Sequence, residues 1–261
     1  MDSVVDEKVL AEIRKGRTFP AFALIGWRWV ARNPVATIVP ILLPFFFLYF
    51  LALITPPEAH LFPLQVVGAM LFTTQNIGSW CLSDSAYWRL EQRLQDMFVA
   101  SPLGKFQYLF GVAFSNLIPA MPALIILGII LSLVTPVSVT GWLVLAAAIF
   151  MVWVLYSAIG IAVSSRLQSQ MEVWPVGNLV FTTLGILSPL YYPLTYLAER
   201  APVWAGLARF LPATYAALIV QSALNLPDAL PSEGLVDAAL LVVSTVVGLV
   251  LAMSLYTWRE H

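Results

Sequence analysis

The chain has 261 residues, of which 60% are apolar and 10% are charged, and its mean hydropathy is +0.87. This composition excludes an ordinary soluble domain and predicts an integral membrane protein. The net charge of -1 without a clustered basic surface argues against a nucleic-acid partner, and the single cysteine, Cys81, excludes an internal disulfide and a cysteine-based metal site.

The apolar residues occur in runs of roughly twenty, the length that a helix needs to cross ~30 Å of hydrocarbon. The runs lack the alternation of a barrel strand, so we expect an all-α fold. Residues 1–34 form the first predicted unit, a cytoplasmic region without a cleavable signal peptide. Apolar and basic side chains are mixed between Val9 and Trp29, which predicts a helix lying on the inner membrane surface with its apolar side in the headgroups.

Residues 35–261 form the second predicted unit, a transmembrane domain of six helices. The predicted spans are 35–54, 61–82, 107–134, 141–164, 173–190 and 235–258. The second span carries a polar cluster, Thr73, Thr74, Gln75 and Asn76. Polar groups in hydrocarbon need partners, so the cluster should face another helix or a wet pathway. Both interpretations, hydrogen bonds between helices and contact with a substrate, remain open.

Residues 191–226 are apolar but contain several prolines, and their longest unbroken piece is Ala213 to Leu224. Twelve helical residues reach only about 18 Å, which is too short to cross a bilayer. We therefore expect an outer re-entrant helical hairpin before the last span.

The distribution of lysine and arginine supports six spans with both termini in the cytoplasm. Only Arg200 and Arg209 then lie outside. The inner side carries Lys8, Arg14, Lys15, Arg17, Arg28, Arg32, Arg89, Arg93, Lys105, Arg166 and Arg259.

Motifs for catalysis and energy conversion are absent from the sequence. His60 and His261 are the only histidines, so neither a histidine-based metal cluster nor a Ser-His-Asp triad can form, and no phosphate-binding loop is present. No ionisable residue lies in the middle of a predicted span, although ion-coupled carriers normally need one. We expect a protein that is not an enzyme and that is driven from outside.

The central polar segment, residues 84–106, is the expected contact for that drive. As a helix from about Ser85 it would place Tyr87, Leu90, Leu94, Met97 and Phe98 on one apolar stripe. Pro102 and Gly104 would end this helix of about four turns. Docking to a soluble partner and passive contact with the membrane surface fit this pattern equally well.

Two sequence runs carry a resemblance to a known family. These are RLEQRLQDMFVASPL at residues 89–103, and SPLYYPLTYL at residues 188–197 followed by LPATY at residues 211–215. Together with the order of the predicted elements, they resemble the permease subunit of ABC type-2 exporters. The resemblance implies a coupling segment at 84–106 (residues Arg89, Glu91, Leu94, Asp96, Met97 and Phe98) that contacts an ABC ATPase subunit, which would bind ATP and Mg while this chain binds no cofactor.

The resemblance further implies a second permease chain, as a homodimer or a related heterodimer, in the lipids of the cell (inner) membrane. The transported compound would be amphipathic, lipid-linked, polysaccharide or drug-like and would move outward. Residues expected along the path or at an outer gate are Thr74, Gln75, Asn76, Tyr191, Tyr192 and Tyr196. Anchoring in the membrane interface would explain the tyrosines as well. A secondary transporter or channel and a non-transporting membrane assembly protein are the alternative functions.

Overall fold

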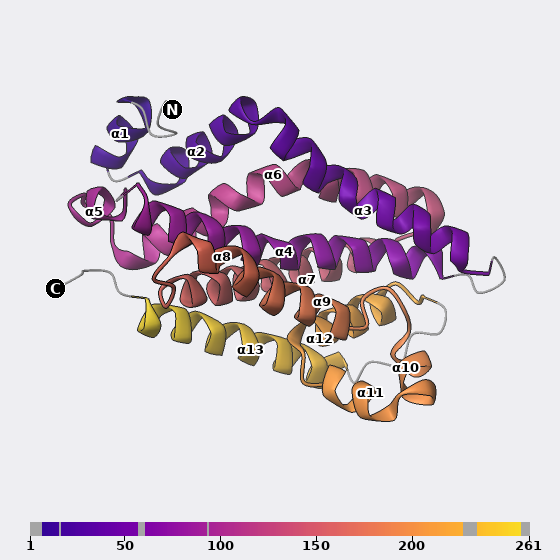
Figure 1. Ribbon diagram of the computed structural model, residues 1–261. Helices are drawn as coiled ribbons and strands as arrows, with labels where there is room; N and C mark the ends of the chain where they lie inside the picture. The colour runs from indigo at the N-terminus through magenta and orange to yellow at the C-terminus, as the bar shows by residue number, and fades with distance from the viewer. Residues whose placement is uncertain (1–6, 16, 57–60, 93, 227–233, 257–261) are drawn as a thin grey trace.

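The computed structural model describes residues 7–15, 17–56, 61–92, 94–226 and 234–256. These residues form helices and short connections without a strand, which confirms the all-α fold class. The helices are α1 (Glu7–Arg14), α2 (Thr18–Arg32), α3 (Pro34–Ile54), α4 (Phe62–Leu90), α5 (Leu94–Val99), α6 (Lys105–Val134), α7 (Val139–Ser164), α8 (Gln170–Gly177), η2 (Asn178–Thr182), α9 (Thr183–Leu187), α10 (Leu194–Arg200), α11 (Pro202–Ala208), α12 (Pro212–Ala223) and α13 (Gly234–Leu255). The long helices run between an end marked by α5 and an end marked by α10 and α11 (Figure 1).

The N-terminal region forms two helices where the sequence predicted one. α2 packs along α6, and its buried residues include Phe22 and Gly26. A Cβ on Gly26 would lie 2.5 Å from the carbonyl oxygen of Ser115 in α6, so the two backbones are in close contact. This face of α2 thus packs on α6, while Phe19 and Trp27 remain exposed on the other, and contact of the apolar side with the headgroups stays a prediction.

α4 lies at the centre of the bundle, where α6 and α7 pack against it most extensively. A Cβ on Gly160 of α7 would lie 2.0 Å from the carbonyl oxygen of Gly78 in α4, and a Cβ on Gly78 would lie 2.4 Å from the carbonyl oxygen of Tyr156. Small residues allow this approach of two backbones, as they do between membrane helices generally. The polar residues of α4 are thus enclosed by other helices.

By length and composition α6, α7 and α13 can each cross a membrane, and α11 with α12 would add a fourth if that pair, bent by 92°, were one span. α3 matches the first predicted span closely. The fifth predicted span is a continuous helical segment from Gln170 to Leu187 that contains the π-helix η2. The six-span arrangement stays a prediction at this point.

The segment 191–226 contains three short helices, α10, α11 and α12, where the sequence predicted a hairpin of two. The prolines at 193, 202 and 212 stand just before α10 or at the first position of α11 and α12, where the missing N–H group costs no hydrogen bond. The chain therefore bends at each of these prolines.

Candidate functional site

The central polar segment is not the single helix of about four turns that the sequence predicted. α4 continues through Ser85 to Leu90, and α5 is a separate helix of 6 residues, Leu94–Val99. Ser85, Ala86 and Trp88 are buried among other helices, so these residues extend α4. The docking element that remains is less than two turns long.

Phe98 anchors α5 to its own chain. The side chain is fully buried, and its ring centroid lies 5.4 Å from that of Phe22 in α2 and 5.2 Å from that of Tyr108 in α6. Leu94 and Met97 are partly buried against the same cluster. Insertion of Phe98 into a groove of a partner is contradicted by this burial, because the apolar stripe of α5 faces inward.

Two acidic side chains of this region are accessible. Glu91, directly after α4, and Asp96, in the first turn of α5, are both exposed. The structure therefore leaves the predicted coupling residues Glu91 and Asp96 available to a partner, as rim charges.

Arg89 was expected at the same rim, but it is half-buried and bonded to the end of α7. Its guanidinium donates hydrogen bonds to the carbonyl oxygens of Ser164 at 2.8 Å and Leu167 at 2.5 Å. These carbonyls lie at and just beyond the C-terminal end of α7, where a cation is favoured by the helix dipole. Arg89 thus links the ends of α4 and α7.

A second set of hydrogen bonds connects α5 and α6 to the end of α13. The ammonium of Lys105 donates to the carbonyl oxygen of Met253 and, at 2.6 Å, to that of Tyr256. The buried hydroxyl of Tyr256 donates to Oε1 of Gln95 in α5 at 2.9 Å. Sequence reasoning missed the roles of Gln95, Lys105 and Tyr256, and no pattern in the sequence points to these contacts between distant residues.

The polar cluster of α4 is satisfied mostly inside the bundle. Thr74 and Gln75 are fully buried, whereas Asn76 is half-buried. Thr74 and Asn76 donate to carbonyl oxygens one turn earlier in α4. Gln75 donates from Nε2 to the carbonyl oxygen of Phe181 in η2 at 3.4 Å, which is the bond between helices that the sequence offered as one alternative.

The predicted gate tyrosines do not form one surface. Tyr191 is 9% exposed, and its ring lies 4.7 Å from Phe47 and 5.7 Å from Phe72, by centroids. Tyr192 is half-buried, and Tyr196 of α10 is exposed. Tyr191 therefore packs on α3 and α4, and of the three tyrosines only Tyr196 is exposed, at 39%.

Asp84 is a carboxyl that the sequence placed in the cytoplasmic segment and that the structure places in α4. It is half-buried and hydrogen-bonded to the side chain of Asn116 in α6. The described part of the chain contains no group of three or more His, Cys, Asp or Glu side chains that could hold a metal ion.

The family model of the ABC-2 type transporter matches residues 21–224 of this chain. The chain belongs to the ABC-2 type transporter family. The match extends from α2 to the end of α12 and includes both α5 and the short helices at the opposite end. No curated protein and no solved structure matches the chain. The ABC-2 chain is an ABC transporter permease and a multi-pass membrane protein, of a family whose members typically work with a separate ABC ATPase subunit and are not themselves enzymes.

Proposed function

We propose that the ABC-2 chain is the transmembrane subunit of an ATP-driven exporter, with six spans, both termini in the cytoplasm and the ATPase subunit bound at the α5 end. The observation that carries this proposal is that α5 contacts the ends of several long helices. Gln95 of α5 meets Tyr256 beyond α13, Phe98 packs on α2 and α6, and α4 ends directly before α5. A displacement of α5 is therefore transmitted to several spans at once.

The course of the helices supports the six-span arrangement. α4, α6, α7, the segment α8–η2–α9 and α13 run lengthwise through the molecule, and α3 runs from the bend after α2 towards the end opposite α5 (Figure 1). Arg89 and Lys105 lie at the α5 end, whereas Arg200 and Arg209 lie in and just after the short helices at the opposite end. Because basic residues are enriched on the cytoplasmic side, the α5 end is the cytoplasmic one.

The mechanism follows from which groups are accessible. The exposed carboxylates Glu91 and Asp96 steer and orient a basic surface of the ATPase, while Leu94, Met97 and Phe98 hold α5 on the bundle. The ATPase binds ATP and Mg, and its closure moves α5 together with α2, α6 and α13. This chain needs no cofactor of its own for that motion.

The outer surface supports a pair of permease chains in lipid. Large apolar side chains are exposed along α3 and α13, among them Phe46, Phe50, Val243 and Val247. Such faces need lipid or another apolar surface. A second permease chain, identical or related, covers part of them, and the substrate, an amphipathic, lipid-linked, polysaccharide or drug-like compound, moves outward between the two chains.

Charge reversal on α5 tests the proposal. Glu91→Lys combined with Asp96→Lys is expected to abolish co-purification of the ATPase subunit, because both carboxylates are exposed and make rim contacts. Glu199→Lys, in the exposed last turn of α10 at the opposite end, is the matched control and should retain the subunit. Retention of the ATPase by the double variant, with unchanged ATP turnover, would overturn the proposal. Phe98→Glu is unsuitable because it would place a charge in the aromatic cluster.

Asp84 is the one observation that favours a secondary carrier. A carrier would use this carboxyl, at its contact with Asn116, to bind a proton during transport. Vesicles that contain the ABC-2 chain alone distinguish the two functions. The exporter gives no proton flux in the absence of the ATPase, whereas a carrier gives a flux that Asp84→Asn abolishes.

A further inference from the structure

An open hollow of about 740 Å³ lies at the junction between α1 and α2. It has no part in the transport mechanism proposed above. Its polar side is formed by Lys8, Glu12 and Arg17. Its apolar wall includes Leu24 and Trp27 of α2 and Ile118 of α6. A charged rim beside an apolar wall is the arrangement of a site for an amphipathic ligand.

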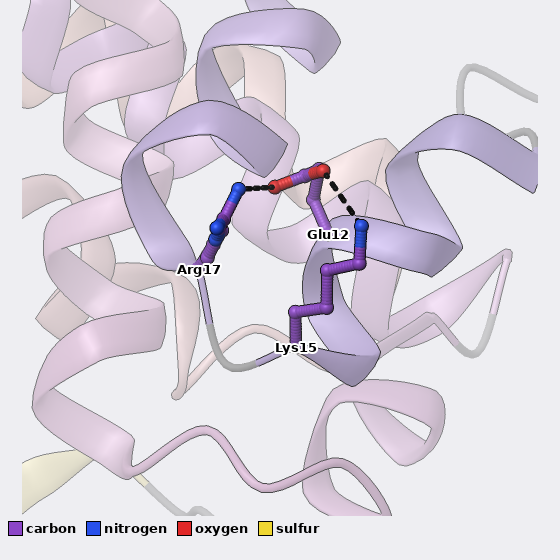
Figure 2. A network of polar contacts seen from close by, with 3 residues as sticks. All are labelled: Glu12, Lys15 and Arg17. Carbon is purple, nitrogen blue, oxygen red and sulfur yellow. Dashed lines mark ion pairs between the residues drawn. The ribbon is translucent and has the colours of Figure 1, made fainter.

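Glu12 positions two cations at this junction (Figure 2). Its carboxylate lies 3.7 Å from the guanidinium of Arg17 and 3.8 Å from the ammonium of Lys15. The side chains of Lys15 and Arg17 are 60% and 64% exposed, and such exposed ion pairs contribute at most about 1 kcal/mol. Of the two cations Arg17 lines the hollow, and its weak pair with Glu12 leaves the guanidinium able to bind an anion that arrives from outside.

A second hollow, of about 450 Å³, also borders Arg17. Arg17 and Pro20 line both hollows, and the second is walled by Phe19, Phe106 and Phe110. Arg17 is thus a cation between two apolar walls, one formed with α6 residue Ile118 and one with the start of α6. Neither a soluble anion nor an uncharged hydrocarbon would use both the charge and the walls.

We propose that this junction binds an anionic phospholipid, with its phosphate at Arg17 and Lys8 and its acyl chains on the two apolar walls. Anionic lipids are concentrated in the cytoplasmic leaflet, and each Lys or Arg near that surface favours their binding. Trp27, which is 64% exposed, is the type of side chain that settles at the headgroup level. The assignment to the inner leaflet rests on the proposed topology, whereas the choice of an anionic lipid rests on the charges and walls alone.

Native mass spectrometry of the purified full-length chain tests the site. The chain is mixed with phosphatidylglycerol or with phosphatidylcholine of the same acyl chains, and we expect phosphatidylglycerol to bind at least about fivefold more tightly, with Arg17→Gln losing about this factor. Arg17→Lys keeps the charge and should retain most of the binding. Arg209→Gln, an exposed cation at the opposite end, is the control and should bind like the unchanged protein.

Two further variants separate the roles of charge and wall. Glu12→Gln removes the negative group of the hollow and should increase phosphatidylglycerol binding, whereas Trp27→Ala should weaken the binding of both lipids. An excess of inorganic phosphate should not displace the lipid, because phosphate has no contact with the walls. Equal binding of the two lipids, displacement by phosphate, or equal losses in Arg17→Gln and Arg209→Gln would overturn the proposal. These measurements do not involve the ATPase, so the lipid site and the exporter mechanism can fail separately.

Discussion

Two glycines set the distance between α4 and α7, and one methyl group at either position should be enough to disturb it. In Gly160→Ala the new Cβ would lie 2.0 Å from the carbonyl oxygen of Gly78, a backbone atom that cannot move aside alone. Overpacking of this kind costs about 1–3 kcal/mol, so we expect a melting temperature several degrees lower in detergent, followed by tryptophan fluorescence. Gly206→Ala, with no atom within 4 Å of its new Cβ, should leave the melting temperature unchanged or higher. A Gly160→Ala protein as stable as Gly206→Ala would show that the helices are farther apart.

Substitution of Gln75 should change stability little, in contrast to Gly160→Ala, because the two polar atoms of its amide differ in their contacts. Nε2 donates to Phe181 at 3.4 Å, but Oε1 is buried without a hydrogen-bond partner. Gln75→Leu loses a bond worth about 0.6 kcal/mol between membrane helices and also removes an unsatisfied acceptor. The melting temperature should therefore change little, whereas Gln75→Glu should lower it by burying a charge. A large loss in Gln75→Leu would mean that Oε1 has a partner in the working assembly.

At the scale of residues, the sequence showed which side chains share a face but not what covers that face. Leu94, Met97 and Phe98 form an apolar stripe whether the stripe meets a partner or α2 and α6 of the same chain. From the sequence alone Arg89 is likewise interpreted as a rim charge, whereas in the structure it bonds to the end of α7. Contacts between residues far apart in the chain decide both cases, and periodicity carries no information about them.

The connection between α5 and α13 is the contact at the scale of elements that matters most for coupling. Tyr256→Phe keeps the ring, whose centroid lies 6.1 Å from that of Tyr108, and removes the hydroxyl that bonds to Gln95 in α5 and interacts with the side chain of Tyr108 in α6. A hydrogen bond of this kind contributes about 0.5–1.5 kcal/mol. We expect faster amide hydrogen exchange in α5, in the last turn of α13 and around Tyr108, with the outer ends of the helices unchanged. Tyr49→Phe, at an exposed position of α3, is the control, and equal exchange in the two variants would show that α5 and α13 are not connected in this way.

The long apolar helices were predictable as elements because an apolar run of sufficient length has few alternatives in a membrane. α3, α6 and α7 begin and end within a few residues of the predicted spans. The second span was predicted to end at Leu82, where polar residues begin, but α4 continues to Leu90 because other helices supply contacts: Trp88 packs on Phe22 of α2 and Phe98 of α5, and Arg89 bonds to the end of α7. Polarity marks the end of a span only where the helix faces lipid or water.

At the scale of the molecule, the same packing explains why a test of length and composition selects α6, α7 and α13 but not the central helix α4. α4 is rich in polar residues because it is shielded by its neighbours, whereas α6, α7 and α13 expose apolar faces and pass a test of length and composition. The segment α8–η2–α9 is interrupted by a π-helix whose carbonyl at Phe181 accepts the bond from Gln75. This bond joins the central helix to the segment inside the bundle, while the outer helices present their apolar faces to lipid.

This arrangement predicts which residues face each side of the membrane. The only cysteine, Cys81, is buried, so Cys81→Ala gives a background without thiols for single new cysteines at Ala100, Glu172 and Glu199, all exposed. With six spans, a membrane-impermeant maleimide added to intact cells should label only Glu199→Cys, because the other two positions lie in the cytoplasm. Permeabilised cells should show labelling of all three, which controls for reactivity. Labelling of Glu172→Cys in intact cells would mean that α8–η2–α9 does not cross from the cytoplasmic side, and labelling of Ala100→Cys would place α5 beyond the reach of any cytoplasmic ATPase.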